Sequence, residues 1–96
     1  MSDLIAGAVS RLNEKMAGQG FDGTAKFVIE DEGAVMIDAD GARAGDEDAE
    51  VILAASAEVF EAILDGEENP TAAYMTGRLK LDGDMAAAMR LASILS

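Results

Sequence analysis

Apolar side chains recur at helical spacing over the first sixteen residues of the chain and fall on one stripe. Ser2 or Asp3 can cap the start of such a helix, and Gly18 and Gly20 follow its end. The pattern therefore predicts an amphipathic first helix. Its apolar stripe comprises Leu4, Ile5, Ala8, Val9, Leu12 and Met16.

The next segments alternate with the two-residue period of strands. Residues 24–30 are rich in β-branched and aromatic side chains, residues 31–33 have a turn sequence, and residues 34–39 supply a second strand. Residues 40–49 contain Gly and acids but no large apolar side chain, so we expect an exposed loop there. A third strand is predicted over residues 50–55.

Two helices are predicted after this third strand. Ser56 can cap a helix that Gly66 ends, and Asn69 with Pro70 can open a short helix that Gly77 ends. Pro at the first helical position loses no hydrogen bond, because that amide has no partner within the helix.

The chain ends with a strand and a helix. Residues 78–82 alternate polar and apolar side chains, Gly83 turns the chain, and Asp84 can cap a final helix over residues 85–95. Strands and helices are grouped rather than alternating, which favours an α+β fold with helices on one face of a largely antiparallel sheet. We expect residues 1–96 to form a single domain.

The final helix is apolar at nearly every position, and only Arg90 and Ser93 are polar. An ordinary surface helix does not show this pattern, so we expect both sides of the helix to be covered. One explanation is a core helix between the sheet and a neighbouring helix. The other is that one side faces an apolar ligand or a partner chain, for which small Ala and flexible Met form an adaptable wall.

The composition excludes much of ordinary catalysis. The chain has no Cys and no His, so it offers neither a thiolate zinc site nor the commonest general base. No serine nucleophile motif and no phosphate-binding loop is present. We therefore expect no enzyme activity of its own and no cofactor.

Nineteen acidic residues against seven basic ones give a net charge of -12. Such a charge repels nucleic acid and anionic membrane surfaces, so we expect no nucleic-acid partner and no stable membrane insertion. The sequence shows neither a leader pattern nor a run of eighteen apolar residues, and the expected location is cytoplasmic.

The acidic segment has some features of a calcium loop. Asp38, Asp40, Gly41 and Glu47 match positions three, five, six and twelve of an EF-hand, but Met36 occupies a position that needs an oxygen ligand. The flanks read as strands, so a solvated loop is favoured and no metal site is predicted.

Lys26, Arg78 and Lys80 are the basic residues of the predicted strands. Solvated strand positions explain them best, because Lys on an edge strand discourages aggregation. If Arg78 and Lys80 flank an apolar pocket, they can meet a carboxylate or phosphate head group.

From Ser56 to Leu95 the chain resembles the sterol carrier protein type 2 lipid-binding domain family, and an acidic, Ala-rich domain of this kind looks like a bacterial stand-alone member. The resemblance rests on the order of motifs: a Ser-led helix ending in Asp-Gly, an Asn-Pro helix ending in Met-Thr-Gly, a Leu-Lys-Leu strand, and Gly-Asp-Met before the last helix. Tyr74, Arg78 and Asp84 depart from the residues usual in the family, and the chain lacks the Ser-Lys-Leu ending of its peroxisomal members.

The resemblance implies a five-stranded sheet with helices on one face, enclosing an apolar tunnel. It implies a fatty acyl, acyl-CoA, isoprenoid or sterol-like guest, with sterol the weakest candidate. The tunnel wall implied by the matching positions comprises Phe60, Ile63, Leu64, Tyr74, Met75, Leu79, Leu81, Met85, Met89 and Leu95.

We therefore hypothesise a non-catalytic carrier of a lipid or other apolar small molecule. The alternatives are a scaffold that dimerises or docks on a lipid-pathway enzyme through the last helix, and an accessory domain that presents lipid to an enzyme. A monomer and a homodimer are both compatible with the sequence. An empty tunnel of about 300 Å³ would cost about 7 kcal/mol, so we expect it to be partly closed or filled.

Overall fold

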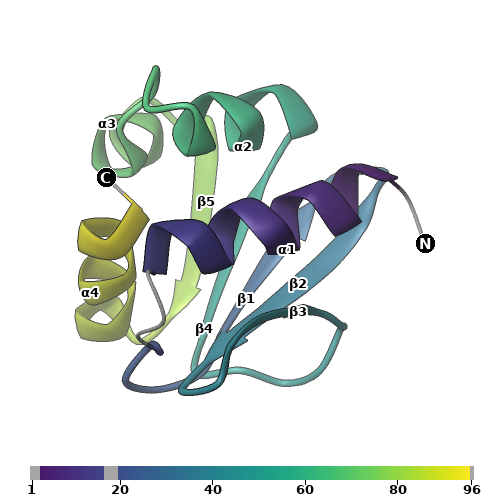
Figure 1. Ribbon diagram of the computed structural model, residues 1–96. Coiled ribbons are helices and arrows are strands. Elements are labelled where there is room, and N and C mark those ends of the chain that lie inside the picture. The colour runs from purple at the N-terminus through teal and green to yellow at the C-terminus, as the bar shows by residue number, and fades with distance from the viewer. Residues whose placement is uncertain (1–2, 17–19, 96) are drawn as a thin grey trace.

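The computed structural model describes residues 3–16 and 20–95, and Ser2 and Gly18 of the predicted helix boundaries lie outside these ranges. Nine elements follow one another along the described chain (Figure 1). They are α1 (Asp3–Met16), β1 (Ala25–Ile29), β2 (Gly33–Asp38), β3 (Gly41–Ala44), β4 (Val51–Ala55), α2 (Ala57–Leu64), α3 (Pro70–Met75), β5 (Leu79–Gly83) and α4 (Met85–Leu95).

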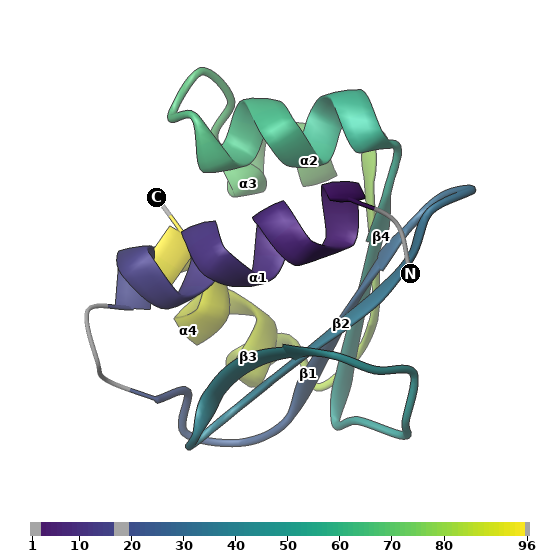
Figure 2. The ribbon, with the colours of Figure 1, turned by 45° about the vertical axis from the view of Figure 1, so that its right-hand side comes forward.

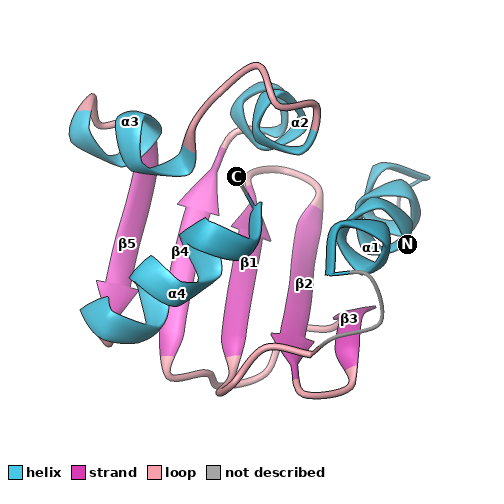
Figure 3. Ribbon diagram, turned by 60° about the vertical axis from the view of Figure 1, so that its left-hand side comes forward, coloured by secondary structure: helices cyan, strands magenta, loops and turns pink. Residues whose placement is uncertain are grey.

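The five strands form one sheet in the order β3-β2-β1-β4-β5. The β1 and β4 strands are parallel, and the other neighbouring pairs are antiparallel. Figure 3 shows this arrangement, with α4 crossing in front of the sheet and α1 beside β2 and β3. The predicted α+β class and the five-stranded, largely antiparallel sheet are confirmed.

The helices lie on one face of the sheet (Figure 2). On β1 the side chains of Ala25, Phe27 and Ile29 are buried on this face, while Lys26 and Val28 on the other face are partly exposed. This alternation is the expected consequence of the two-residue period of a strand. No helix of the described chain is long and apolar enough to cross a membrane.

The buried core of the described chain includes the three Phe residues. The rings of Phe27 in β1 and Phe60 in α2 have centroids 4.4 Å apart and are tilted by 57°. Leu12 of α1 is fully buried with them. Large branched and aromatic side chains thus join α1, α2 and the central strands.

The predicted loop over residues 40–49 is wrong for its first part, because Gly41–Ala44 is the edge strand β3. Ala is a poor strand former, so the segment gives no strand signal. The strand is held by α1: the Asn13 side chain accepts a hydrogen bond from the Ala42 N–H at 2.9 Å and donates one to the Ala42 carbonyl at 3.1 Å. These two bonds also satisfy edge groups that would otherwise attract another strand.

The predicted helix ends around α2 and α3 are confirmed. The Ser56 and Asn69 side chains accept hydrogen bonds from backbone amides of the first turns. At the other ends Gly66 and Gly77 have φ of 80° and 82°, each in the left-handed position that closes a helix. These caps fix where α3 begins and where the chain turns into β5.

The turn between β5 and α4 is equally constrained. Gly83 has φ of 103°, and a Cβ at this position would lie 2.2 Å from the Glu50 carbonyl oxygen. The next amide, of Asp84, donates to the same oxygen at 3.0 Å, and the Asp84 carboxylate accepts from the Ala86 amide at 2.9 Å. Asp84 therefore caps α4, as predicted, and ties it to the start of β4.

Candidate functional site

Helix α4 is covered on one side only. Ala87, Ala88, Leu91 and Leu95 are buried against the rest of the fold. On the outer side Met85 and Met89 are 47% and 54% exposed. The explanation of a core helix packed on both sides is therefore wrong for the described chain, because no neighbouring element lies over these two residues, and cover by a ligand or a partner chain stays a prediction. An apolar surface is left at this end of the molecule.

An apolar hollow opens beside these methionines, between β5, α3 and α4. It has almost no polar lining. Leu53 of β4 and Leu79 and Leu81 of β5 contribute from the sheet, and the two helices contribute the remaining residues. The full lining is Leu53, Pro70, Thr71, Tyr74, Leu79, Leu81, Met85, Ala88, Met89 and Ala92.

The hollow encloses about 40 Å³, whereas small-molecule pockets usually begin near about 300 Å³. At the cavity coefficient, an empty space of this size costs about 1 kcal/mol rather than about 7. The roomy tunnel implied by the resemblance is therefore not seen between β5, α3 and α4. A larger guest requires Tyr74, Met85 and Met89 to move, and thioether side chains rotate readily.

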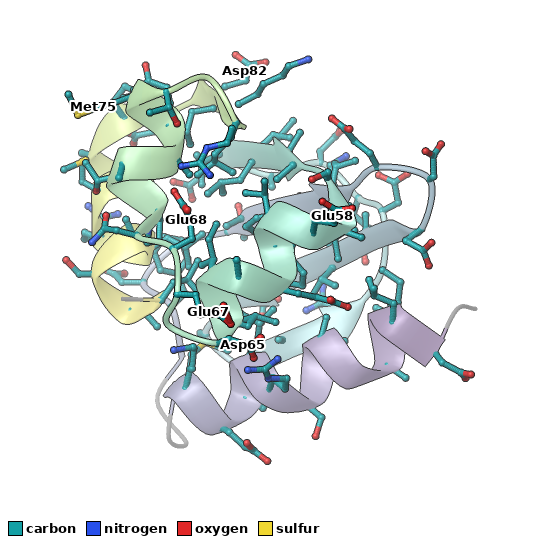
Figure 4. The ribbon with its side chains drawn as sticks, turned by 90° about the horizontal axis from the view of Figure 1, so that it is seen from above. Glu58, Asp65, Glu67, Glu68, Met75 and Asp82 are labelled. Atoms are coloured by element: carbon teal, nitrogen blue, oxygen red, sulfur yellow. The ribbon has the colours of Figure 1, made fainter. Side chains whose placement is uncertain are left out.

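The structure divides the predicted wall residues into three groups. Five of them line the hollow together: Tyr74, Leu79, Leu81, Met85 and Met89. Four lie in the buried core and not on the hollow: Phe60, Ile63, Leu64 and Leu95. Met75 is 80% exposed at the end of α3 and points outward (Figure 4).

Sequence reasoning missed five residues of the lining: Leu53, Pro70, Thr71, Ala88 and Ala92. A signal existed for Leu53, which lies directly opposite Leu81 in the β4–β5 register and so shares its face. Ala88 and Ala92 follow Met85 at helical spacing, i+3 and i+7, and therefore lie on the same stripe. Their small side chains leave the space that the hollow occupies.

A second hollow of about 210 Å³ lies between α1 and α2. Phe60 and Leu64, two of the predicted wall residues, contribute to its lining. The guanidinium of Arg11 forms an ion pair with Asp65 between these helices. The full lining is Asp3, Leu4, Gly7, Ala8, Arg11, Phe60, Glu61 and Leu64.

Neither Arg78 nor Lys80 is presented as a free cation to the apolar hollow. The Arg78 guanidinium pairs with Glu68, and its Nε donates to the Thr76 hydroxyl at 3.1 Å. Lys80 alternates with Leu79 and Leu81 along β5 and so lies on the opposite face of the strand. Among the described residues, the surroundings of the hollow thus favour an apolar guest over a charged one.

In the acidic segment, the carboxylates pair with the side chain of Arg43. Asp38 pairs with Arg43, and the second guanidinium nitrogen of Arg43 lies 3.5 Å from Glu47. The hydrogen bond from Arg43, together with one from the Asp40 amide, lowers the pKa of Asp38 below its usual value. No group of three His, Cys, Asp or Glu side chains that can hold a metal is found in residues 3–16 and 20–95.

Solved structures share this fold. The sterol carrier protein domain 2 of Helicoverpa armigera is 24% identical with a TM-score of 0.76, and the alignment covers 96% of this chain and 85% of that one. Sterol carrier protein 2 of Aedes aegypti, solved in complex with the C16 fatty acid palmitate, is 18% identical with a TM-score of 0.76, covering 100% and 97%.

A larger enzyme contains a similar unit. The sec-alkylsulfatase Pisa1 from Pseudomonas sp. is 24% identical over 93% of this chain but only 15% of its own length, with a TM-score of 0.62. No curated protein matches the sequence significantly. The fold is thus that of a small domain which exists alone and within longer chains.

The family follows from the sequence itself. The model of the SCP-2 sterol transfer family matches residues 6–96, nearly the whole chain. The chain belongs to this family, as its motifs over residues 56–95 indicated.

Proposed function

We propose that the protein is a non-catalytic cytoplasmic carrier that holds one apolar chain in the hollow between β5, α3 and α4. The observation that carries the proposal is the composition of this hollow: an almost wholly apolar lining that includes Met85, Met89 and Tyr74. Membership of the SCP-2 sterol transfer family supports a lipid as the guest. The palmitate complex of the Aedes aegypti protein, which has the same fold, supports a single-chain lipid.

The energetics favour a single acyl or isoprenoid chain. Burying a chain of about sixteen carbons gains about 12 kcal/mol before the costs of ordering and association. Part of this gain is spent on displacing Met85 and Met89 from the space. The lining offers no charged partner for a head group, so we expect micromolar affinity and weak selectivity among chains.

Displacement of a fluorescent C16 fatty acid by unlabelled palmitate tests the proposal. Ala92 and Ala86 are both on α4, but only Ala92 lines the hollow, while Ala86 is exposed. We expect Ala92→Leu to fill the hollow and weaken binding at least about tenfold, and Ala86→Leu to change it less than about twofold. Circular dichroism melting shows whether both variants are folded.

A third variant shows whether weaker binding comes from a blocked hollow or from a destabilised fold. Met89→Ala widens the hollow, so it should retain palmitate and accept bulkier chains better than the wild type does. Equal effects of Ala92→Leu and Ala86→Leu, or no saturable binding by the wild type, would rule out this hollow as the lipid site.

The accessory role is a second candidate that one observation favours. In the Pseudomonas alkylsulfatase a unit of this fold is part of a much longer enzyme. We propose that this chain can likewise present a bound lipid to an enzyme, supplied here by another chain. Activity of such an enzyme on lipid bound to wild-type protein, and its loss with Ala92→Leu, would support this role.

A further inference from the structure

The two edges of the sheet differ in how their outward backbone groups are bonded. At the β3 edge, the Asn13 side chain bonds both the amide and the carbonyl of Ala42. The other edge is β5. Unbonded backbone groups along an edge strand form a template on which another strand can pair. The bonding of β5 therefore decides whether this edge can accept a partner.

The hydrogen bonds of β4 show which groups of β5 point outward. The Ala55 carbonyl accepts from the Glu30 amide at 3.0 Å, so Ala55 bonds toward β1. Bonding direction alternates along a strand, so Ala54 bonds toward β5, where its partner is Lys80. The next residue, Leu81, therefore directs its N–H and C=O away from the sheet. No other described segment supplies a hydrogen bond to them.

The side chains of β5 form one apolar face and one charged face. Leu79 and Leu81 lie toward the helices, whereas Lys80 and Asp82 are exposed on the opposite face. Strand β4 places only apolar side chains beside these two charges. Among the described residues, no ion pair is found for either of them. The edge thus presents one free cation and one free carboxylate, two residues apart.

We propose that β5 is the interface of a homodimer, in which the β5 strands of two copies pair antiparallel about a two-fold axis at Leu81. In this register Lys80 of each copy lies directly opposite Asp82 of the other. A slip by two residues keeps the hydrogen bonds but places Lys80 opposite Lys80, or Asp82 opposite Asp82. The charges of β5 therefore favour a second copy in this one register.

The same axis brings exposed apolar residues together. Helices α3 and α4 flank opposite ends of β5 on one face of the sheet (Figure 3), and the axis places α3 of one copy beside α4 of the other. Tyr74 and Met75 of α3 are 42% and 80% exposed. They would meet Met85 and Met89 of the other copy, which are 47% and 54% exposed. Met75 does not line the hollow, and Figure 4 shows it on the same side of the molecule as Asp82, away from α1.

The net charge of -12 on each copy opposes association at long range. At physiological salt the screening length is about 8 Å, so charges far from β5 act weakly across the interface. The strand itself carries one Lys and one Asp and is neutral. We therefore expect a weak dimer, with a dissociation constant in the micromolar range.

Sedimentation equilibrium of the full chain, stripped of lipid, tests the pairing by exchanging charges. Lys80→Asp and Asp82→Lys each place like charges opposite one another, and each should weaken the homodimer at least about tenfold. Mixed together, the two variants restore opposite charges at both positions. The mixture should therefore form a heterodimer with a dissociation constant within about threefold of the wild-type value. Both side chains are exposed, so the fold should tolerate the changes.

Two further variants separate the interface from general effects. Glu30→Lys, in the exposed β1–β2 turn, changes the net charge as Asp82→Lys does and should not weaken the dimer. Met75→Ser should weaken it about threefold, because its apolar contact is lost. Amide hydrogen exchange gives a direct readout: the Leu81 amide should exchange more slowly as the protein concentration rises. The Lys80 amide, bonded to β4, should be protected at every concentration.

Four results would overturn the proposal. They are a monomer at every concentration, a dimer that Asp82→Lys leaves unchanged, no heterodimer in the mixture, and a dimer in which the Leu81 amide gains no protection. The proposal does not rest on the carrier function. Its assay contains no lipid, so its failure is distinct from a failure of lipid binding.

Discussion

The two ends of the helical layer differ in how they are packed. Beneath α1 and α2, Phe27, Phe60 and Leu12 are at most 1% exposed, and two of the rings are in direct contact. Beside α3 and α4, the side chains are mostly Ala, Leu and Met, and Met85 and Met89 remain about half exposed. One region is filled by rigid aromatic and branched groups, and the other by small and flexible ones.

The two kinds of packing differ in what they contribute: rigid side chains contribute stability, and flexible ones contribute adaptability. Interdigitated rigid side chains lose much free energy when any one of them is cut back. Thioether side chains on the surface lose little and can change their arrangement around a guest. We therefore expect the folding free energy to come mainly from the aromatic core, and we propose the α3–β5–α4 region for the binding role.

The largest expected effect comes from cutting back one residue in each region. Phe27→Ala should lower the free energy of unfolding by about 3–5 kcal/mol, because it leaves a cavity at the ring contact. Met89→Ala should lower it by less than about 1 kcal/mol, since the side chain is 54% exposed. Urea unfolding at 25 °C measures both, and similar losses would contradict the division.

The junction between the two regions can be tested at Gly83. Gly83→Ala should lower the free energy of unfolding by about 1–3 kcal/mol, because φ is 103° and the new Cβ would meet the Glu50 carbonyl oxygen. Gly7→Ala is the matched control: nothing lies within 4 Å of its Cβ position in α1, so it should stabilise the helix by about 0.5–1 kcal/mol. Thermal melts of both variants should show a lower melting temperature for Gly83→Ala and a higher one for Gly7→Ala than for the wild type.

The smallest expected effect on stability comes from the ion pair between Asp38 and Arg43 at the β2–β3 hairpin. The pKa of Asp38 is lowered by Arg43, so the carboxylate stabilises the fold above its usual value of 3.8, and this stability is lost as the pH falls through the folded-state pKa. Asp38→Asn should therefore be slightly less stable than the wild type at pH 6 and approach it at pH 3. The Asp38 side chain is 20% exposed and Arg43 is 47% exposed, which keeps the difference small. A difference that grows toward low pH would contradict the ion pair.

Much of the fold could be predicted because its boundaries have local chemical signals. Ser56, Asn69 and Asp84 cap helices through their own side chains, and Gly66 and Gly77 close them with positive φ. Strand β3 could not be predicted from local pattern, because its short Gly- and Ala-rich segment carries no strand signal of its own. It is held by pairing with β2 and by two hydrogen bonds with the side chain of Asn13, twenty-nine residues earlier in the chain.

The same reasoning predicted only part of the lining of the hollow. Helical spacing places Met85 and Met89 on one side of α4, and alternation places Leu79 and Leu81 on one face of β5, but neither rule says what packs against that side. Phe60 and Ile63 carry the same apolar pattern, yet they fill the core rather than the hollow. Only three-dimensional packing separates a wall residue from a core residue.

Native mass spectrometry of the protein as purified tests the central claim most directly, since it weighs the protein and any guest together. We predict a species heavier than the 96-residue chain by the mass of one single-chain lipid, which added palmitate replaces and which Ala92→Leu lacks. A bare chain that acquires no mass in excess palmitate, with Ala92→Leu indistinguishable from the wild type, would contradict the account.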